Sequence, residues 1–258
     1  MTLADRKLPI SLVVITKNEA SCLAKCLQSA DFVSEIVVVD SGSTDDTVQI
    51  AERFGAKVFH QDWLGFGPQK QFAVNCAKYD WVLCLDADEY LSPRLKESLK
   101  NLFTKDPADH AYCFPRCNKF FGRFLRHGEG YPDLSLRLFN RQYAHWSEDL
   151  VHEKIVPNDQ DFQVRRLEGD LMHESGESIS KYIEKQNTYT SIQAKLMWKQ
   201  GKKASVTKIV VSPLVRFLKF YFIKGGFMDG LPGLIHISIG CFTVFFKYVK
   251  LMSFSRCQ

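Results

Sequence analysis

The sequence predicts an α/β fold with a mostly parallel sheet flanked by helices, followed by a helical, amphipathic C-terminal appendage. Two observations lead to this. Over residues 10–85, short apolar runs rich in β-branched residues alternate with segments of helical period. From residue 204 onward the chain becomes apolar and basic. We therefore expect one domain over residues 1–203, with halves 1–100 and 101–203, and a distinct segment over 204–258.

The first half of the chain alternates strands and helices. The near-continuous apolar run Ile10–Thr16 predicts a buried strand, and Leu23, Cys26 and Leu27 follow at helical spacing. The same alternation continues with strands at 34–39, 56–59 and 81–85 and helices at 47–54 and 67–77. Strands joined by helices predict right-handed crossovers and a sheet that is buried on both faces.

Two carboxylates stand directly after the apolar strand at 81–85. Asp86 and Asp88 are separated by one small residue, and carboxylates are costly to bury unless something pairs with them. Open α/β sheets bind ligands at the carboxyl ends of their strands. The pattern therefore favours a divalent cation held by Asp86 and Asp88. The alternative is a surface turn that leads to a helix beginning at Ser92-Pro93.

A second strand also ends in a carboxylate. Asp40 is followed by Ser41-Gly42-Ser43-Thr44-Asp45, which has neither the glycine pattern of a dinucleotide loop nor the lysine of a P-loop. The carboxylate of Asp40 is suited to accept hydrogen bonds from a pyrimidine base or a ribose hydroxyl. A role in the turn and in capping the next helix is equally compatible with these residues.

Charge and cysteine usage limit the partners and the compartment. The net charge of the chain is +5. The segment from Ala204 to the end has a net charge of +6, and the residues before it have a net charge of −1. A nucleic-acid partner is not expected, because it would require a basic face on the folded core. The eight cysteines are scattered, which indicates reduced thiols and a cytoplasmic location rather than a zinc site. The polar stretch Met1 to Pro9 does not read as a secretory signal.

The strand-end motifs carry a family resemblance. Residues 16–19 (TKNE), 39–45 (VDSGSTD) and 86–89 (DADE) occur in that order, and they resemble the N-terminal half of family 2 glycosyltransferases with the Rossmann-like GT-A fold. Three further segments, 63–71, 146–153 and 227–230, are similar to bacterial lipopolysaccharide-core β-1,4-glucosyltransferases that extend an inner-core heptose. This likeness covers nearly the whole chain.

The resemblance implies a metal-dependent donor site in residues 1–100, the half expected to bind the nucleotide sugar. In such enzymes a divalent ion, Mg²⁺ or Mn²⁺, neutralises the departing nucleotide diphosphate as a Lewis acid. Asp88 would be the main metal ligand, and Asp86 would contact the ribose, or the ion through water. His173, in the stretch Leu171–Ser175, would complete the metal shell, although a lone histidine is more often a hydrogen-bonded core residue.

The resemblance also implies roles for other donor-side residues. Asp40 would read the uracil, and Thr16 and Glu19 would line the nucleoside pocket. Lys70 lies on a predicted helix and would offset phosphate charge, unless it is simply a solvated lysine. Arg137 lies on a predicted strand with alternating polarity and would contact the diphosphate or orient the catalytic base.

The acceptor half, residues 101–203, contains the candidate general base. Inverting transfer needs a carboxylate on the face of the sugar opposite the leaving group. Glu148, Asp149 and Glu153 form an acidic cluster next to Trp146 and His152. The resemblance favours Glu153, with Asp149 second. One helical turn would place these two on the same side of a helix, and Glu148 would then be a first-turn acid.

The C-terminal appendage is predicted to be helical and to contact a membrane surface. Ser178–Lys199 reads as a helix whose inner side carries Tyr182, Tyr189, Ile192 and Leu196. The apolar stretches 206–223 and 231–246 are interrupted or flanked by lysines. We interpret them as interfacial, with Lys219, Lys224, Lys247 and Lys250 facing anionic head groups. The alternative is a buried helical hairpin.

Together these features predict an inverting hexosyltransferase that moves glucose from UDP-glucose to a heptose of a lipid-linked oligosaccharide. It would act as a peripheral protein on the inner face of the inner membrane. Three alternatives stay open: a GT-A transferase with another sugar nucleotide or with another lipid-linked or protein acceptor, an inactive membrane-bound carbohydrate-binding adaptor, and a nucleotidyltransferase. The last would need a glycine- and lysine-rich phosphate loop, which residues 16–19 do not provide.

Overall fold

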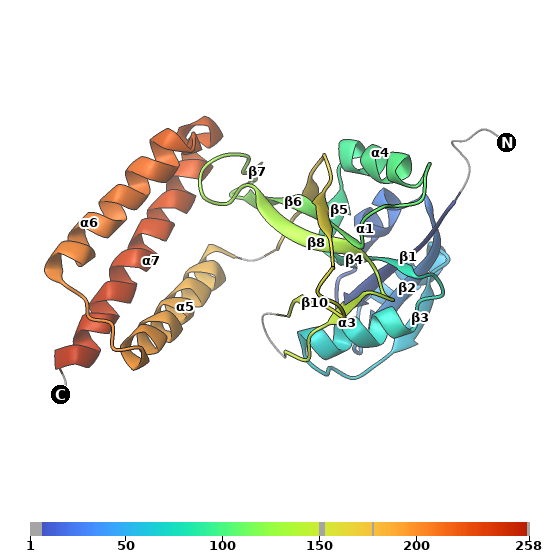
Figure 1. The fold of residues 1–258 in the computed structure, drawn as a ribbon, viewed down its shortest axis with the longest axis horizontal. Helices are drawn as coiled ribbons and strands as arrows, with labels where there is room; N and C mark the ends of the chain where they lie inside the picture. The colour runs from blue at the N-terminus through green and yellow to red at the C-terminus, as the bar shows by residue number, and fades with distance from the viewer. Residues whose placement is uncertain (1–6, 150–152, 177, 257–258) are drawn as a thin grey trace. The chain divides into compact units, whose positions relative to one another are not determined.

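The computed structural model describes residues 7–149, 153–176 and 178–256. The chain forms two compact units (Figure 1): Met1–Arg116 with Asp133–His173, and Cys117–Pro132 with Glu174–Gln258. The sequence predicted a boundary after residue 203. The division instead falls after His173, because helix α5 (Ile179–Lys199) packs along α7 (Gly230–Arg256) within the second unit.

The first unit is built on a mixed sheet whose strands follow the order β3-β2-β1-β4-β8-β6-β12-β5. The parallel half confirms the prediction and consists of β1 (Leu8–Thr16), β2 (Val33–Asp40), β3 (Lys57–His60) and β4 (Trp81–Asp86). The remaining strands on this path are β5 (Glu89–Leu91), β6 (Ala111–Phe120), β8 (Asp133–Asn140) and β12 (Leu171–His173). In this half β8 is antiparallel to both β4 and β6, and β12 is antiparallel to β5. Strand β11 (Val164–Arg166) pairs parallel with β6 off the main path.

Helices cover both faces of the sheet, which explains why its central strand β1 is mostly apolar. Ile10, Leu12 and Val14 of β1 belong to one core, and Val13 between them belongs to the other. The first core includes buried residues of α1 (Leu23–Ser29), α2 (Thr47–Arg53) and α4 (Pro93–Leu102). The second core includes residues of α3 (Phe66–Asn75). The Ser92 side chain caps α4, as the predicted helix start requires.

Glu148, Asp149 and Glu153, the described acids after Trp146, are not helical, contrary to the prediction. Strand β9 (Ala144–Trp146) pairs antiparallel with β10 (Ile155–Pro157), and Ser147 N donates to the Lys154 carbonyl at 2.8 Å. The acids therefore lie in the connection of a hairpin, and the helical-turn argument that related Asp149 to Glu153 is wrong. His152 of the predicted cluster lies outside the described residues.

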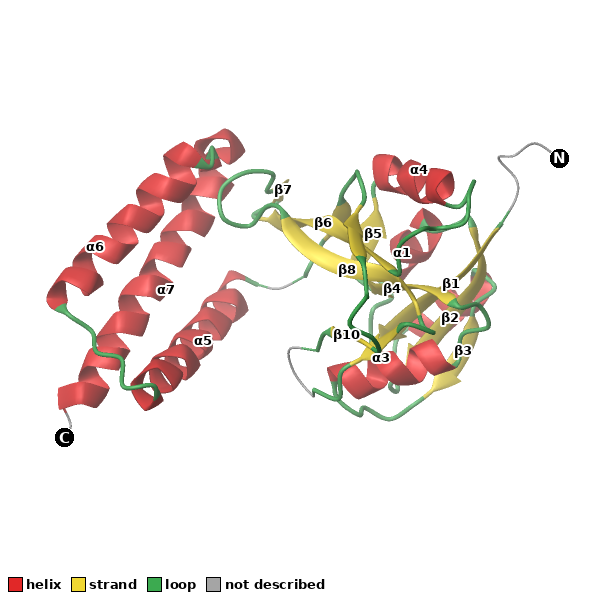
Figure 2. Cartoon of the chain, in the orientation of Figure 1, coloured by secondary structure: helices red, strands yellow, loops and turns green. Residues whose placement is uncertain are grey.

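The second unit consists of helices and of the loop that follows β6, with its short strand β7 (Arg123–Phe124). Helix α7 lies between α5 and α6 (Val206–Phe217), as Figure 2 shows. The π-helical turn η2 (Leu218–Ile223) and the 3-10 turn η3 (Gly226–Asp229) connect α6 to α7.

Two residues on α5 differ from the prediction. Ile192 and Leu196 are exposed rather than on the inner side, and the buried positions of α5 are Thr190 and Ala194. Small side chains at the buried positions allow α5 to approach α7 closely.

Candidate active site

Three predicted donor-site residues lie at the same edge of the sheet. Thr16 ends β1 and is in register with Asp40 at the end of β2, and Asp86 at the end of β4 is in register with Ile15. The carboxyl ends of these parallel strands therefore bring together the motifs that are separated in the sequence. This is the edge where α/β sheets bind ligands.

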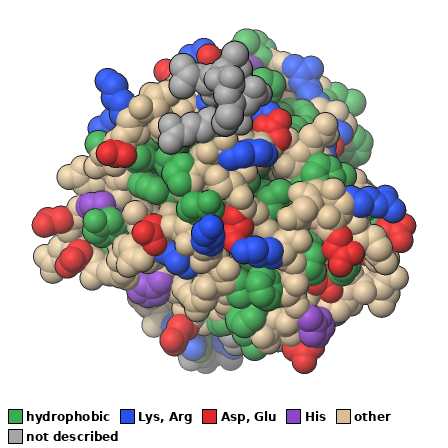
Figure 3. Space-filling model, turned by 90° about the vertical axis from the view of Figure 1, so that its right-hand side faces the viewer, with side chains coloured by type: hydrophobic (Ala, Val, Ile, Leu, Met, Phe, Trp, Pro, Cys, Tyr) green, Lys and Arg blue, Asp and Glu red, His purple; other side chains and the backbone are tan. Residues whose placement is uncertain are grey.

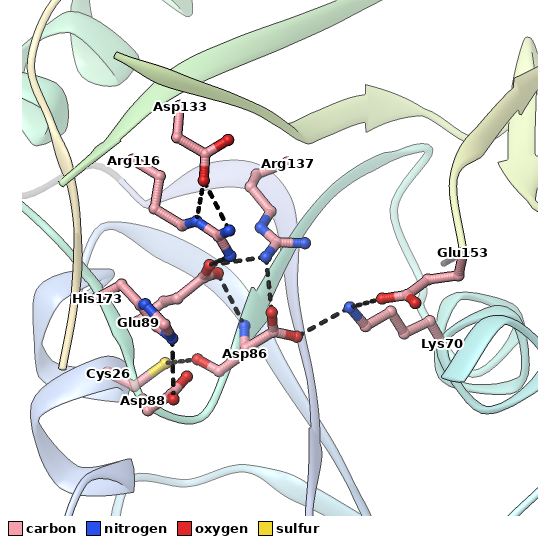
Figure 4. Close-up of polar contacts among 10 residues, drawn as sticks. All are labelled: Cys26, Lys70, Asp86, Asp88, Glu89, Arg116, Asp133, Arg137, Glu153 and His173. Atoms are coloured by element: carbon pink, nitrogen blue, oxygen red, sulfur yellow. Dashed lines mark hydrogen bonds and ion pairs between the residues drawn. The ribbon is translucent and has the colours of Figure 1, made fainter. Parts of the chain in front are cut away.

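A network of charged side chains surrounds Asp86 (Figure 4). Arg137 on β8 donates from Nη2 to Asp86 Oδ2 at 2.6 Å, and Lys70 on α3 contacts Asp86 Oδ1 at 3.0 Å. The same Lys70 nitrogen lies 2.7 Å from Glu153 Oε1. Lys70 is only 6% exposed, so it is not a solvated helix lysine. The structure thus brings together the four predicted residues Lys70, Asp86, Arg137 and Glu153.

Buried opposite charges shift the pKa values inside this network. Burial raises the pKa of Asp86, but the charges of Arg137 and then Lys70 outweigh it and hold that pKa well below its usual range. Burial alone would lower the pKa of Arg137, yet Asp86 and Glu89 raise it above the ordinary value. Asp86 is therefore an anion and Arg137 a cation at neutral pH.

Glu89 and Arg116 also belong to the network, although sequence reasoning gave them no role. Glu89 is fully buried, accepts from Arg137 Nη2 at 2.7 Å and accepts from the Asp86 backbone N–H at 3.1 Å. Arg116 on β6 lies 3.6 Å from Glu89 and 2.7 Å from Asp133. The only signal in the sequence was the position of Glu89 directly after Asp88 in the acidic motif 86–89.

Asp88 and His173 form a second, separate pair. The His173 Nε2 and Asp88 Oδ2 atoms are 3.1 Å apart (Figure 4), because antiparallel pairing of β12 with β5 puts His173 opposite Glu89. Glu19 belongs to the same surroundings. Its pKa is raised by burial and then by the negative charges of Asp88 and Asp45. A cation between these acids would relieve that repulsion.

The residues present fit a divalent cation with few protein ligands. Among the residues that the structure describes, no three His, Cys, Asp or Glu side chains gather into a metal-binding group. Asp88 and His173 offer one oxygen and one nitrogen donor, and both are partly exposed. Mg²⁺ commonly takes only one or two protein ligands and completes its shell with phosphate oxygens and water. Asp86 already accepts from two protein cations, one at each carboxylate oxygen. The lone pairs that remain on these oxygens can still contact the ion or its bound water.

The predicted nucleoside-side residues surround a tight turn. Asp40 Oδ2 accepts from the backbone N–H groups of Gly42 at 2.9 Å and Ser43 at 2.8 Å, and its other oxygen accepts from the Ser43 hydroxyl. Gly42 has φ = 86°, which explains the glycine. The Thr16 hydroxyl is buried and has no hydrogen-bond partner among the described residues. The turn role of Asp40 is thus present, and its contact with a base stays a prediction.

Of the three candidate bases, only Glu153 is joined to the network. Its side chain is 18% exposed and is held by Lys70, whereas Glu148 and Asp149 are exposed. Asp149 contacts helix α3 through its backbone, because its carbonyl oxygen accepts from Gly67 N at 3.1 Å. The geometry therefore separates Glu153 from the other two acids.

The mixed sheet with its flanking helices is a fold of the GT-A type, and the site lies at the end of its parallel half. Residues 11–160 match the sequence model of Glycosyl transferase family 2, and the chain belongs to this family.

Full-length relatives support the assignment. An uncharacterized glycosyltransferase of Rickettsia typhi is 36% identical and covers 95% of this chain and 87% of its own length. The lipopolysaccharide core biosynthesis glycosyltransferase LpsC of Rhizobium meliloti is 30% identical, covering 95% of this chain and 92% of its own. Among solved structures, the mannosyltransferase PcManGT of Pyrobaculum calidifontis, in complex with GDP-Man and Mn²⁺, has a TM-score of 0.52 at 15% identity, covering 98% and 88% of the two chains. This last likeness concerns the fold.

Proposed function

We propose that the chain is an inverting, metal-dependent hexosyltransferase that transfers glucose from UDP-glucose to an inner-core heptose during lipopolysaccharide core biosynthesis. The acceptor would be a lipid-linked oligosaccharide at the cytoplasmic face of the inner membrane. The similarity to LpsC over 95% of this chain supports the pathway. The sugar and the acceptor rest on the resemblance of segments such as 63–71 and 146–153 to heptose glucosyltransferases.

The donor side of the reaction would use the Asp88–His173 pair. These two residues would hold Mg²⁺ or Mn²⁺, which supplies Lewis-acid stabilisation of the departing diphosphate when bound. Arg137 and Lys70 add two buried positive charges next to Asp86. Such preorganised charges stabilise negative charge that develops on a leaving group.

The acceptor side would use Glu153 as the general base. The carboxylate takes the proton of the acceptor hydroxyl as that oxygen attacks the anomeric carbon from the face opposite the diphosphate. The observation that carries this assignment is Lys70, whose nitrogen lies 3.0 Å from Asp86 and 2.7 Å from Glu153. Through Lys70 the base is tied to the same network as the donor-side carboxylate.

A donor panel tests the proposal. The purified chain is incubated with UDP-glucose, UDP-galactose, UDP-N-acetylglucosamine or GDP-mannose, with Mn²⁺ and a heptose-terminated lipid oligosaccharide, and nucleotide diphosphate release is measured. We expect turnover with UDP-glucose and a β-linked product. Turnover with GDP-mannose alone would reassign the donor. In a parallel assay with UTP and glucose 1-phosphate, pyrophosphate release would indicate a nucleotidyltransferase.

Two substitutions separate the metal site from the base. Asp88→Asn should remove the Mn²⁺ dependence of donor binding, measured by calorimetry with UDP. Glu153→Gln should lower turnover by about 10²–10⁴-fold, as expected for loss of a general base, while donor affinity changes little. Asp149→Asn is the matched control and should retain activity. If Asp149→Asn instead shows the loss, the base assignment is reversed.

A further inference from the structure

The outward face of α6 and η2 is apolar, which is the reverse of a helix in water. Val206, Val210, Leu214, Leu218 and Phe222 follow one another at intervals of four and are each between 54% and 67% exposed. No residue of α6 or η2 is buried. A helix that packs on a water-soluble domain normally turns its polar side chains outward.

Helix α7 exposes a second apolar row. Its exposed side chains include Leu231, Phe242, Phe245, Phe246 and Val249. At 3.6 residues per turn these five lie on one side of the helix. The opposite side carries the buried positions Gly233, Ile237, Val244 and Leu251. We call the outward rows of α6, η2 and α7 the apolar surface of the second unit. By contrast, the face of the molecule drawn in Figure 3 intersperses acidic, basic and hydrophobic side chains.

The charged side chains of α6, η2 and α7 themselves are all basic. Asp229 is the only acidic residue between Gln200 and Gln258. It is 1% exposed and accepts from the backbone of Arg126 and His127, so it does not oppose an anionic partner. Lys208, Lys219 and Lys224 are exposed on or beside the apolar surface. Exposed aliphatic and aromatic side chains combined with lysines complement the acyl chains and anionic head groups of a bilayer.

One ion pair determines how deep the helices can lie. Residues Gly226–Phe254 are long and apolar enough to cross a bilayer, and an 18-residue window within them has a mean hydropathy of 1.5. Halfway along this stretch, Arg216 and Glu129 form an ion pair against Gly240, where an added Cβ would meet the Glu129 carboxylate at 2.7 Å. Crossing the bilayer would carry this pair to the hydrocarbon centre, which is unfavourable for charged groups. Helices lying in the membrane plane avoid that cost.

We infer that the apolar surface of α6, η2 and α7 inserts into one leaflet of an anionic bilayer, with these helices parallel to the membrane plane. Lys208, Lys219 and Lys224 face the lipid phosphates. The inference does not rest on the proposed reaction, because a chain without transferase activity would carry the same surface. Under this inference the helices are not a buried hairpin. They contact lipid, chiefly through the outward face of α6.

Vesicle sedimentation of the full chain tests this. Protein is added to preformed vesicles of phosphatidylcholine, alone or with about a third of phosphatidylglycerol, and the bound fraction is measured at low and high salt. We expect binding to the anionic vesicles, and at least a tenfold loss of partition for Leu214→Gln/Leu218→Gln. Lys208→Gln/Lys219→Gln should reduce binding at low salt and leave less salt dependence.

The matched control lies on α5. Ile192→Gln/Leu196→Gln removes two aliphatic side chains of similar exposure, 49% and 53%, from the same unit but outside the apolar surface. Its partition should stay within twofold of the unaltered chain. Equal losses in both double variants would overturn the assignment to α6. Two other outcomes would overturn the inference: a stable dimer that ignores vesicles, or protein that incorporates only when present during vesicle formation, as a spanning helix would.

Discussion

Replacing Glu89 by Gln should destabilise the first unit, because the carboxylate is fully buried between two guanidinium groups. It accepts from Arg137 at 2.7 Å and lies 3.6 Å from Arg116. Removing one partner of a buried ion pair costs about 3–5 kcal/mol. Since Asp86 still neutralises Arg137, we expect the free energy of unfolding to fall by about 2–4 kcal/mol. In thermal unfolding this corresponds to a decrease of roughly 5–15 °C in Tm.

The control is Asp133→Asn, which also removes a carboxylate from Arg116, at a side chain that is 40% exposed. An exposed ion pair contributes at most about 1 kcal/mol, so this variant should unfold close to the unaltered chain. The reasoning would be refuted if Glu89→Gln lay within about 0.5 kcal/mol of the unaltered chain, a change typical of surface positions. Equal losses from both variants would refute the role of burial.

Two further predictions concern packing and pH. Gly67→Ala would place a Cβ 2.1 Å from the Ser147 carbonyl oxygen. It should therefore lower the free energy of unfolding, measured in urea, by about 1–3 kcal/mol. The control Gly176→Ala, with nothing within 4 Å of its Cβ, should leave that free energy unchanged. Burial raises the pKa of Glu35, but hydrogen bonds from Lys57 and other groups outweigh it and lower that pKa below its ordinary 4.5. Its stabilisation is therefore present above this value and lost as the pH falls below it, so Glu35→Gln should flatten the acid decline in stability between about pH 5 and pH 3. Unchanged acid sensitivity would contradict the pairing.

Most of the parallel half of the fold was predictable because its central strands are buried on both faces and therefore have nearly continuous apolar runs, as at Ile10–Thr16. The antiparallel half was not predictable. Strand β12 has three residues and pairs with β5, far away in the sequence. The hairpin at Trp146 was mistaken for a helix because its acids have helical spacing, and strand pairing overrode that local pattern.

The sequence identified most members of the site but not their contacts. Lys70, Asp86, Arg137 and Glu153 were all predicted from motifs, yet nothing in the residues specified that Lys70 bridges two of them. That contact depends on where α3 lies relative to the β9–β10 hairpin. Glu89 was missed because a motif names its residues without showing which of them are buried.

Asp86 and Asp88 differ in what their loss would do to the folded protein, and therefore in how evolution should retain them. Asp86 contacts Lys70 and Arg137, so its loss would remove one of the two carboxylates that each of these buried cations contacts. Asp88 contacts His173 at the partly exposed end of the site, so its loss should spare folding. Descendants of this chain that abandon catalysis while remaining folded should therefore retain Asp86 and lose Asp88. The presence of Asp86 in a relative would then indicate common descent, and the presence of Asp88 would indicate retained catalytic activity.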